Sequence, residues 1–230
     1  MPPKVRYFFM KKINIALEKM SALGLPTVVA ILVALTLFLA YFYRDPERIP
    51  PQKENVVVSP ADGKIIYVRE IRKGEILWSR KGDKKILLEE IVWDKDLKFD
   101  LGKIFGVYMS PFDVHVNRSP IQGRVVKIKH FKGKRLRLGN IKSEFLNKRT
   151  VIVIEHPKGF QVAIVQIAAL IVGKIECYVK EGDTVKLGQR IGRIVFGSQV
   201  DLIIPSLPNL KTLGKNGEKV FAGETVLAEF

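Results

Sequence analysis

A long stretch without charge near the N-terminus constrains this chain most. Residues Met20–Tyr43 include no charged side chain, and Leu25–Tyr43 is almost entirely apolar. As a helix, those nineteen residues would rise about 28 Å, close to the roughly 30 Å of a bilayer core. A cleavable signal peptide has a shorter apolar core and a small-residue cleavage site, whereas this run ends in the aromatic and basic residues Tyr41–Arg44. The stretch therefore predicts an N-terminal membrane helix rather than a buried core helix.

This helix divides the chain into three expected parts. Residues 1–43 form an amphipathic segment and a membrane anchor, because apolar side chains recur at helical spacing over Tyr7–Met20. Residues 44–55 are rich in proline and predict a stiff linker. Residues 56–230 predict the folded domain. Basic residues flank the helix on both sides, so their distribution does not fix its orientation; we expect the domain on the cytoplasmic side of the cell membrane.

The net charge predicts an anionic partner. The chain has 39 Lys and Arg residues against 23 Asp and Glu, a formal charge of +16, which favours nucleic acid or an anionic lipid surface. The densest basic run, Lys127–Arg149, contains only Phe131 and Phe145 as aromatic residues, too few for a platform on which bases stack. A solvated surface loop is an equal alternative for this run. Together with the apolar stretch, the composition favours lipid and argues against nucleic acid.

From Val56 onward the pattern changes to short apolar runs separated by glycine and proline. Closely spaced runs rich in valine and isoleucine are typical of β-strands. They occur at residues 64–68, 104–109, 124–129, 151–154, 161–167, 190–195 and 200–204. We therefore expect a mainly β domain.

Two internal repeats indicate the architecture of that domain. Ser59–Val68 matches Ser119–Ile128, each with a turn, a glycine and a strand, and Gly182–Gly192 matches Gly217–Leu227. The second pattern, two turn glycines around a valine, is typical of half-motifs in biotinyl- and lipoyl-like domains. We therefore expect a barrel-sandwich hybrid with internal pseudo-symmetry. The carrier domains of this type modify a lysine in a Met-Lys pair, and no such pair follows Val56, so a swinging-arm carrier is not expected.

Few residues could carry nucleophilic or acid–base chemistry. His115 lies in a proline-bounded loop crowded with polar groups, an environment in which histidine can be functional. We expect His130 and His156 to be ordinary surface residues, and Cys177 to be a small buried thiol. The pair Gly197–Ser198 lies between two expected strands and by itself indicates only a turn. Its serine hydroxyl could attack the preceding glycine carbonyl if a base removed the hydroxyl proton.

Five segments of the chain occur in an order that is specific when they are taken together. They are Phe42–Arg48, Ser59–Gly63, Met109–Arg118, Gln166–Ala168, and Cys177–Asp183 leading to Phe196–Asp201. In these segments the chain resembles the phosphatidylserine decarboxylase family, in its short form, which includes archaetidylserine decarboxylases. The resemblance covers most of the chain, from about residue 41 to residue 205.

The resemblance implies a self-processing triad. Asp62 would orient His115 and stabilise its charged form, and His115 would take the hydroxyl proton of Ser198. Ser198 would then attack the carbonyl group of Gly197 and convert the amide to an ester. β-Elimination would cleave the chain and leave dehydroalanine, which hydrolyses to a covalent pyruvoyl cofactor at position 198.

Cleavage would give a β chain of residues 1–197 and an α chain of residues 198–230. Decarboxylation of an amino acid builds up negative charge at Cα, which no ordinary side chain accepts. The pyruvoyl ketone would form a Schiff base with the substrate amine and supply that electron sink, without pyridoxal phosphate or a metal. His115 is the expected proton donor to Cα. Longer members of the family carry two histidines in this loop, whereas here Asn117 and Arg118 follow a lone His115.

The resemblance thus implies a membrane enzyme that converts phosphatidylserine or archaetidylserine to the corresponding ethanolamine phospholipid and CO₂. A homodimer is common among relatives. The main alternative is a membrane-anchored, lipoyl-like adaptor without catalysis, which would need a long helical hairpin that the sequence lacks. A basic nucleic-acid-binding barrel is a second alternative, and the apolar stretch argues against it. The sequence does not distinguish diacyl from ether-linked lipid tails.

Overall fold

Two compact units make up the chain, Met1–Arg44 and Asp45–Phe230, and we describe each by itself. The proline-rich segment that follows Arg44 belongs to the larger unit. The computed structural model describes residues 11–15, 18, 24–72, 75–77, 85–87, 101–134, 146–168, 173–195 and 198–230.

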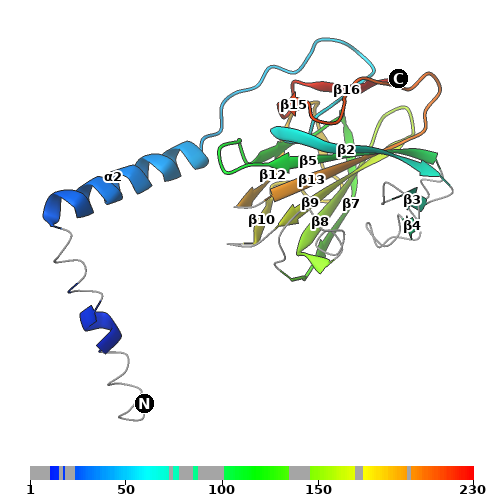
Figure 1. The fold of residues 1–230 in the computed structure, drawn as a ribbon. Helices are drawn as coiled ribbons and strands as arrows, with labels where there is room; N and C mark the ends of the chain where they lie inside the picture. Colours follow the sequence, from blue (N-terminus) through cyan, green and yellow to red (C-terminus); the bar gives the residue numbers. More distant parts are fainter. Residues whose placement is uncertain are drawn as a thin grey trace. The chain divides into compact units, whose positions relative to one another are not determined.

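The smaller unit contains an apolar helix, α2 (Leu25–Phe42; Figure 1). Pro26 lies in its first turn, where the missing backbone N–H is tolerated. The eighteen residues of α2 rise about 27 Å, less than the roughly 30 Å of a bilayer core. Within the described part of the chain, no helix is long and apolar enough to cross a membrane. The structure therefore confirms a helix here but does not support the expected N-terminal membrane helix.

The larger unit is built around one curled antiparallel sheet of ten described strands (Figure 1). The order across the sheet is β11-β7-β8-β9-β13-β5-β2-β3-β4, and β15 pairs with β2 outside this path. Each of these strands contains valine or isoleucine, which favour extended backbone. The strands are β2 (Gly63–Arg72), β3 (Glu75–Leu77), β4 (Lys85–Leu87), β5 (Leu101–Met109), β7 (Gly123–Phe131), β8 (Arg149–Glu155), β9 (Gln161–Ala168), β11 (Thr184–Val185), β13 (Ser198–Pro205) and β15 (Lys219–Val220).

Two three-stranded sheets complete the larger unit. One has the order β1-β16-β14 and the other the order β10-β12-β6. Their strands are β1 (Val56–Val58), β6 (Val116–Arg118), β10 (Lys174–Cys177), β12 (Arg190–Val195), β14 (Lys211–Thr212) and β16 (Val226–Glu229). The expectation of a mainly β domain is confirmed.

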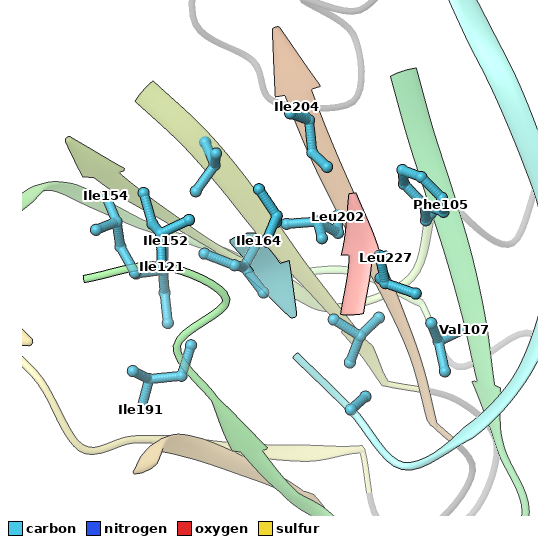
Figure 2. Packing of buried hydrophobic residues seen from close by; sticks show 14 of the residues in the cluster. Phe105, Val107, Ile121, Ile152, Ile154, Ile164, Ile191, Leu202, Ile204 and Leu227 are labelled. Atoms are coloured by element: carbon cyan, nitrogen blue, oxygen red, sulfur yellow. The ribbon is translucent and has the colours of Figure 1, made fainter. Parts of the chain in front are cut away.

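Strand β13 lies between two hydrophobic clusters, because successive side chains of a strand point to opposite faces of the sheet. Val200 belongs to the larger cluster, as do Leu202 and Ile204, which Figure 2 labels. Ile203 belongs to the second cluster. All four side chains are fully buried. The enclosed strand therefore holds its first residue, Ser198, in a fixed position in the interior.

The repeats seen in the sequence form two equivalent units. β2 and β7 both begin at a glycine; Gly63 pairs with Val220 of β15, and Gly123 pairs with Val185 of β11. A Cβ atom at either glycine would lie 2.1 Å from a carbonyl oxygen of the neighbouring strand, that of Tyr108 in the case of Gly63. Only glycine permits this close approach of the backbones. Each unit thus joins one repeat of the first kind to one repeat of the second kind.

Candidate active site

Ser198 begins β13 and lies between two neighbouring strands. Its backbone pairs with Met109 of β5 and with Ala168 of β9. The side chain is fully buried, and its Oγ has no hydrogen-bond partner among the described residues. A buried hydroxyl without a partner costs free energy, so such a group calls for an explanation such as a catalytic role. Gly197, the other half of the expected cleavage site, lies outside the described residues.

His115 lies in the loop between β5 and β6 and is 1% exposed. Its Nδ1 is 2.9 Å from the carbonyl oxygen of Asp113. Because a carbonyl oxygen can only accept, Nδ1 carries the hydrogen, and the neutral ring presents Nε2 as its basic nitrogen. The Asp113 carboxylate in turn accepts hydrogen bonds from the N–H and the hydroxyl of Ser110, at 2.8 and 2.7 Å, which closes the loop. This geometry suits His115 to act as a base through Nε2.

Asp62 directly precedes β2 and is 4% exposed. Its Oδ2 accepts a hydrogen bond of 2.8 Å from Nη2 of Arg48, and its Oδ1 accepts one of 2.7 Å from the backbone N–H of Ala222. A second guanidinium nitrogen of Arg48 donates to Glu224 at 2.8 Å. Charge-assisted bonds of this kind favour the ionised carboxylate and fix its orientation.

Three strand ends bring the predicted triad residues to one end of the sheet. β2 begins directly after Asp62 and runs antiparallel to β5, whose last residue is Met109. Met109 in turn pairs with Ser198 at the start of β13, and His115 follows β5 by six residues. The hydrogen bonds of Asp62 described here go to Arg48 and Ala222, and that of His115 goes to Asp113. Direct contacts from Asp62 to His115 and from His115 to Ser198 therefore stay a prediction.

A pair of buried amides lies on the same face of the sheet as Ser198. Gln166 of β9 is opposite Val200, and its Nε2 donates a hydrogen bond of 2.8 Å to Oδ1 of Asn117. The Asn117 amide contacts the sulfur of Met109 at 3.7 Å. The sequence motifs included both amides without assigning them a role. Gln166 is a polar residue within a run of buried apolar residues in β9. This feature of the sequence could have identified it as a candidate.

Comparison with known proteins identifies the family of the chain. The sequence model of the phosphatidylserine decarboxylase family matches residues 35–228. The chain belongs to this family. A "Phosphatidylserine decarboxylase proenzyme" of Geobacter sulfurreducens is 38% identical over 198 residues, which cover 86% of this chain and 80% of the relative. A "Putative archaetidylserine decarboxylase proenzyme" of Methanocaldococcus jannaschii is 37% identical over 196 residues, which cover 85% of this chain and 91% of the relative.

Membership of the phosphatidylserine decarboxylase family confirms the resemblance found in the sequence. It also decides between the alternatives: the chain is a decarboxylase rather than an adaptor without catalysis or a nucleic-acid-binding barrel. Both relatives are named as proenzymes, which is consistent with a precursor that is processed.

A second buried polar cluster of this decarboxylase lies on the opposite face of β13. The hydroxyl of Tyr67 donates a hydrogen bond of 2.8 Å to Oδ1 of Asp201. Nε2 of Gln199 donates to the same oxygen at 2.8 Å and to the Tyr67 hydroxyl at 3.0 Å. Burial raises the pKa of Asp201 to about 6, against the opposing effect of these hydrogen bonds and of the Arg69 charge. The sequence did not indicate this cluster, because Tyr67 comes from a distant strand.

The other histidines and the cysteine of the decarboxylase lie away from the triad residues in sequence. His156 is buried and stacks on Phe160, with ring centroids 4.7 Å apart, and burial lowers the pKa of its imidazole. The expectation of a surface residue is wrong here, because Phe160 and Phe230 cover the ring. His130 is exposed, as expected. Cys177 is half-buried, and burial raises the pKa of its thiol, which disfavours a nucleophilic thiolate.

Proposed function

We propose that the chain is a proenzyme that cleaves itself between Gly197 and Ser198 and then decarboxylates a serine phospholipid by means of the pyruvoyl group formed from Ser198. One observation carries the proposal. The buried Ser198 hydroxyl lacks a hydrogen-bond partner among the described residues, at the end of the sheet that also carries Asp62 and His115. A serine with a purely structural role would be expected to form a hydrogen bond.

In the proposed cleavage, His115 takes the hydroxyl proton of Ser198 through Nε2, and Asp62 stabilises the resulting imidazolium. Oγ then attacks the carbonyl carbon of Gly197, and the peptide nitrogen leaves as the free amine of residue 198. Loss of the α-proton of residue 198 breaks its Cβ–O bond and releases the carboxylate of Gly197. Water converts the remaining dehydroalanine to pyruvoyl and ammonia. Burial of Ser198 limits the access of water that would hydrolyse the ester instead.

The pyruvoyl group supplies the electron sink that decarboxylation requires and that ordinary side chains lack. The position of Ser198 fits such a group, because its neighbours Met109 and Ala168 are apolar and fully buried. The remaining tasks fall to the residues of the chain. His115 holds the proton that is delivered to Cα, and the walls of the site keep bulk water away from the reacting atoms.

The proposed substrate is a phospholipid with a phosphoserine head, either phosphatidylserine or archaetidylserine. The products are the corresponding ethanolamine phospholipid and CO₂. Relatives named for each of the two lipids are similarly identical to this chain, at 38% and 37%. The head group is therefore proposed from the family, and the choice between ester-linked and ether-linked tails is a matter for assay.

We also propose that the enzyme works on the cytoplasmic side of the cell membrane, where α2 attaches it to lipid. Apolar side chains of α2, among them Ile31, Leu32 and Leu37, are more than half exposed, as suits contact with acyl chains. The net charge of +16 favours an anionic lipid surface. Washing membranes with alkaline carbonate would release a chain that is held only by charge and would retain one that is inserted through α2.

Two further proposals concern the architecture of the larger unit and the oligomeric state. The paired repeats favour a barrel-sandwich hybrid of the biotinyl- and lipoyl-like kind for the larger unit. The α and β chains of one precursor would stay together as a protomer, and two protomers would form a homodimer. Light scattering in mild detergent distinguishes the homodimer from a single protomer.

A denaturing gel tests the central proposal. The wild-type chain is expected to yield fragments of 197 and 33 residues, the smaller with a blocked N-terminus and a mass that identifies pyruvoyl. Ser198→Ala is expected to abolish cleavage and decarboxylation, whereas Ser206→Ala, at an exposed position after β13, should leave both intact. Release of CO₂ from diacyl and ether-linked phosphoserine lipids in parallel would identify the substrate. An uncut chain with full decarboxylase activity would contradict the proposed self-cleavage mechanism.

A further inference from the structure

A segment that precedes β1, Asp45–Arg48, is bound at both ends by charged side chains, and we call it the strap. At its first residue, Asp45 accepts hydrogen bonds from Nη2 of Arg118 at 3.3 Å and from Nε of Arg190 at 2.6 Å. The two arginines are paired across β6 and β12, and Arg118 is 5% exposed. Because adjacent like charges repel, the carboxylate between them stabilises their pairing.

At the other end of the strap, Arg48 binds two carboxylates at once. Its guanidinium donates to Asp62 and to Glu224, each at 2.8 Å. The side chains of Arg48 and Asp62 are largely buried, at 14% and 6% exposure. Removal of one partner from such a pair leaves the other charge buried and uncompensated. The N–H of Ala222 holds the second oxygen of Asp62, and Arg48 is thus one of the donors that set the direction of this carboxylate.

Each end of the strap leads to a part of the proposed cleavage machinery. The arginines bound by Asp45 lie on β6, which begins directly after His115, and on β12, which ends two residues before Gly197. Arg48 binds Asp62 itself. The strap therefore ties together the strand after the expected base, the strand that leads to the expected cut, and the expected orienting carboxylate.

We propose that Arg48 is a positioning residue for self-cleavage, and that the strap must be docked before the chain can cut itself. This inference rests on the proposed function. Arg48 acts through Asp62 and does not touch the reacting atoms. Misplacement of a catalytic group by 1 Å can cost about 100-fold in rate, so release of the strap is expected to slow self-cleavage by about that factor.

The test follows cleavage of the full chain after cell-free synthesis, by the appearance of the small fragment on a denaturing gel. Arg48→Ala is expected to slow cleavage by about 100-fold. Guanidinium, at a concentration far below that which unfolds the chain, should restore much of the rate, and sodium chloride at equal ionic strength should not. Arg48→Lys is expected to lie between, because an ammonium keeps the charge but not the two-sided fork of donors. The matched control, Lys53→Gln, breaks an exposed ion pair with Glu229 and should cleave at the wild-type rate.

The outcomes separate this inference from the proposed function. If the wild-type chain does not cleave, the proposed function fails. If the wild type cleaves and Arg48→Ala cleaves equally fast, the positioning role fails while the proposed function stands. Should Arg48→Ala cleave slowly without rescue by either guanidinium or lysine, its effect is a general loss of fold and the positioning role is again overturned. Thermal unfolding of Arg48→Ala in the uncleavable Ser198→Ala background reports the fold independently.

Discussion

The hydroxyl of Tyr67 reaches the buried carboxylate of Asp201 across an intervening strand, with a hydrogen bond of 2.8 Å. Tyr67 lies on β2 and Asp201 on β13, and both are paired with Gly106 of β5, which lies between them. A Cβ atom on Gly106 would lie 2.3 Å from the Tyr67 ring. The glycine therefore makes room for the ring that carries the hydroxyl to its partner.

The stability of the domain should fall with rising pH because of Asp201. Its pKa of about 6 in the folded state lies above the ordinary value of 3.8. Between these two values the unfolded chain ionises and the folded chain does not, so the free energy of unfolding falls as pH rises through this window. The difference corresponds to roughly 3 kcal/mol above pH 6.

Asp201→Asn is expected to remove that dependence, because an amide can still accept the Tyr67 hydrogen bond but does not ionise. Denaturant unfolding at a series of pH values measures it, in a Ser198→Ala background that keeps the chain in one piece. The stability advantage of the variant should grow from about pH 4 to pH 6 and then level off. Parallel curves for the variant and its parent would contradict the raised pKa.

Gly106→Ala is expected to destabilise the fold by about 1–3 kcal/mol, because the added methyl group meets the Tyr67 ring in a packed interior. Replacing the ring as well, in Gly106→Ala with Tyr67→Ala, should cost less than the sum of the two single changes. Chemical denaturation of the four chains in the double-mutant cycle gives the coupling. Strict additivity would show that the ring and the glycine do not depend on each other.

The effects on stability of changing Gln166 and Asn117, the amide pair beside Ser198, should likewise be non-additive. Gln166→Leu removes the donor to Oδ1 of Asn117 and leaves that buried oxygen without its partner, at a cost of about 1–3 kcal/mol. Changing both residues to leucine should cost less than the two single changes together, because no polar group is then left behind. If the single and double variants have equal free energies of unfolding but differ in cleavage rate, the amide pair has a role in the chemistry beyond packing.

After the proposed cut, the α chain should remain bound to the β chain without a covalent link. β13 is hydrogen-bonded to β5 on one side and to β9 on the other, and its residues are almost all buried. Both fragments should therefore elute together in size-exclusion chromatography and separate only in denaturant. Loss of the small fragment under native conditions would contradict the central position of β13.

Local patterns in the sequence predicted the strands well. The apolar runs at 104–109, 161–167 and 200–204 lie within β5, β9 and β13, because β-branched residues favour extended backbone wherever they pack. The order of those strands in the sheet was not predictable, since it depends on contacts between residues far apart in sequence. The length of the N-terminal helix was overestimated by one residue, with Tyr43 lying at its C-cap.

The partners of buried charged and titratable side chains could not be predicted from the sequence either. Prolines after residue 44 indicated a stiff segment, but not that Arg48 would bind Glu224, 176 positions away. His156 was expected at the surface because a proline follows it, yet Phe230 from the end of the chain covers its ring. Local features singled out His115 and Ser198, but Asp62 became a candidate only through the family motifs, since no local pattern brings these residues to one end of a sheet.

The paired repeats have a consequence for how the mature enzyme is assembled. The unit that joins β7 to β11 lies wholly before residue 197, whereas the unit that joins β2 to β15 takes one repeat from each side of the proposed cut. One half of the domain is thus a continuous polypeptide, and the other is a case of fragment complementation. After the proposed cut, the pairing of β2 with β15 therefore joins two separate polypeptides, whereas the pairing of β7 with β11 stays within one.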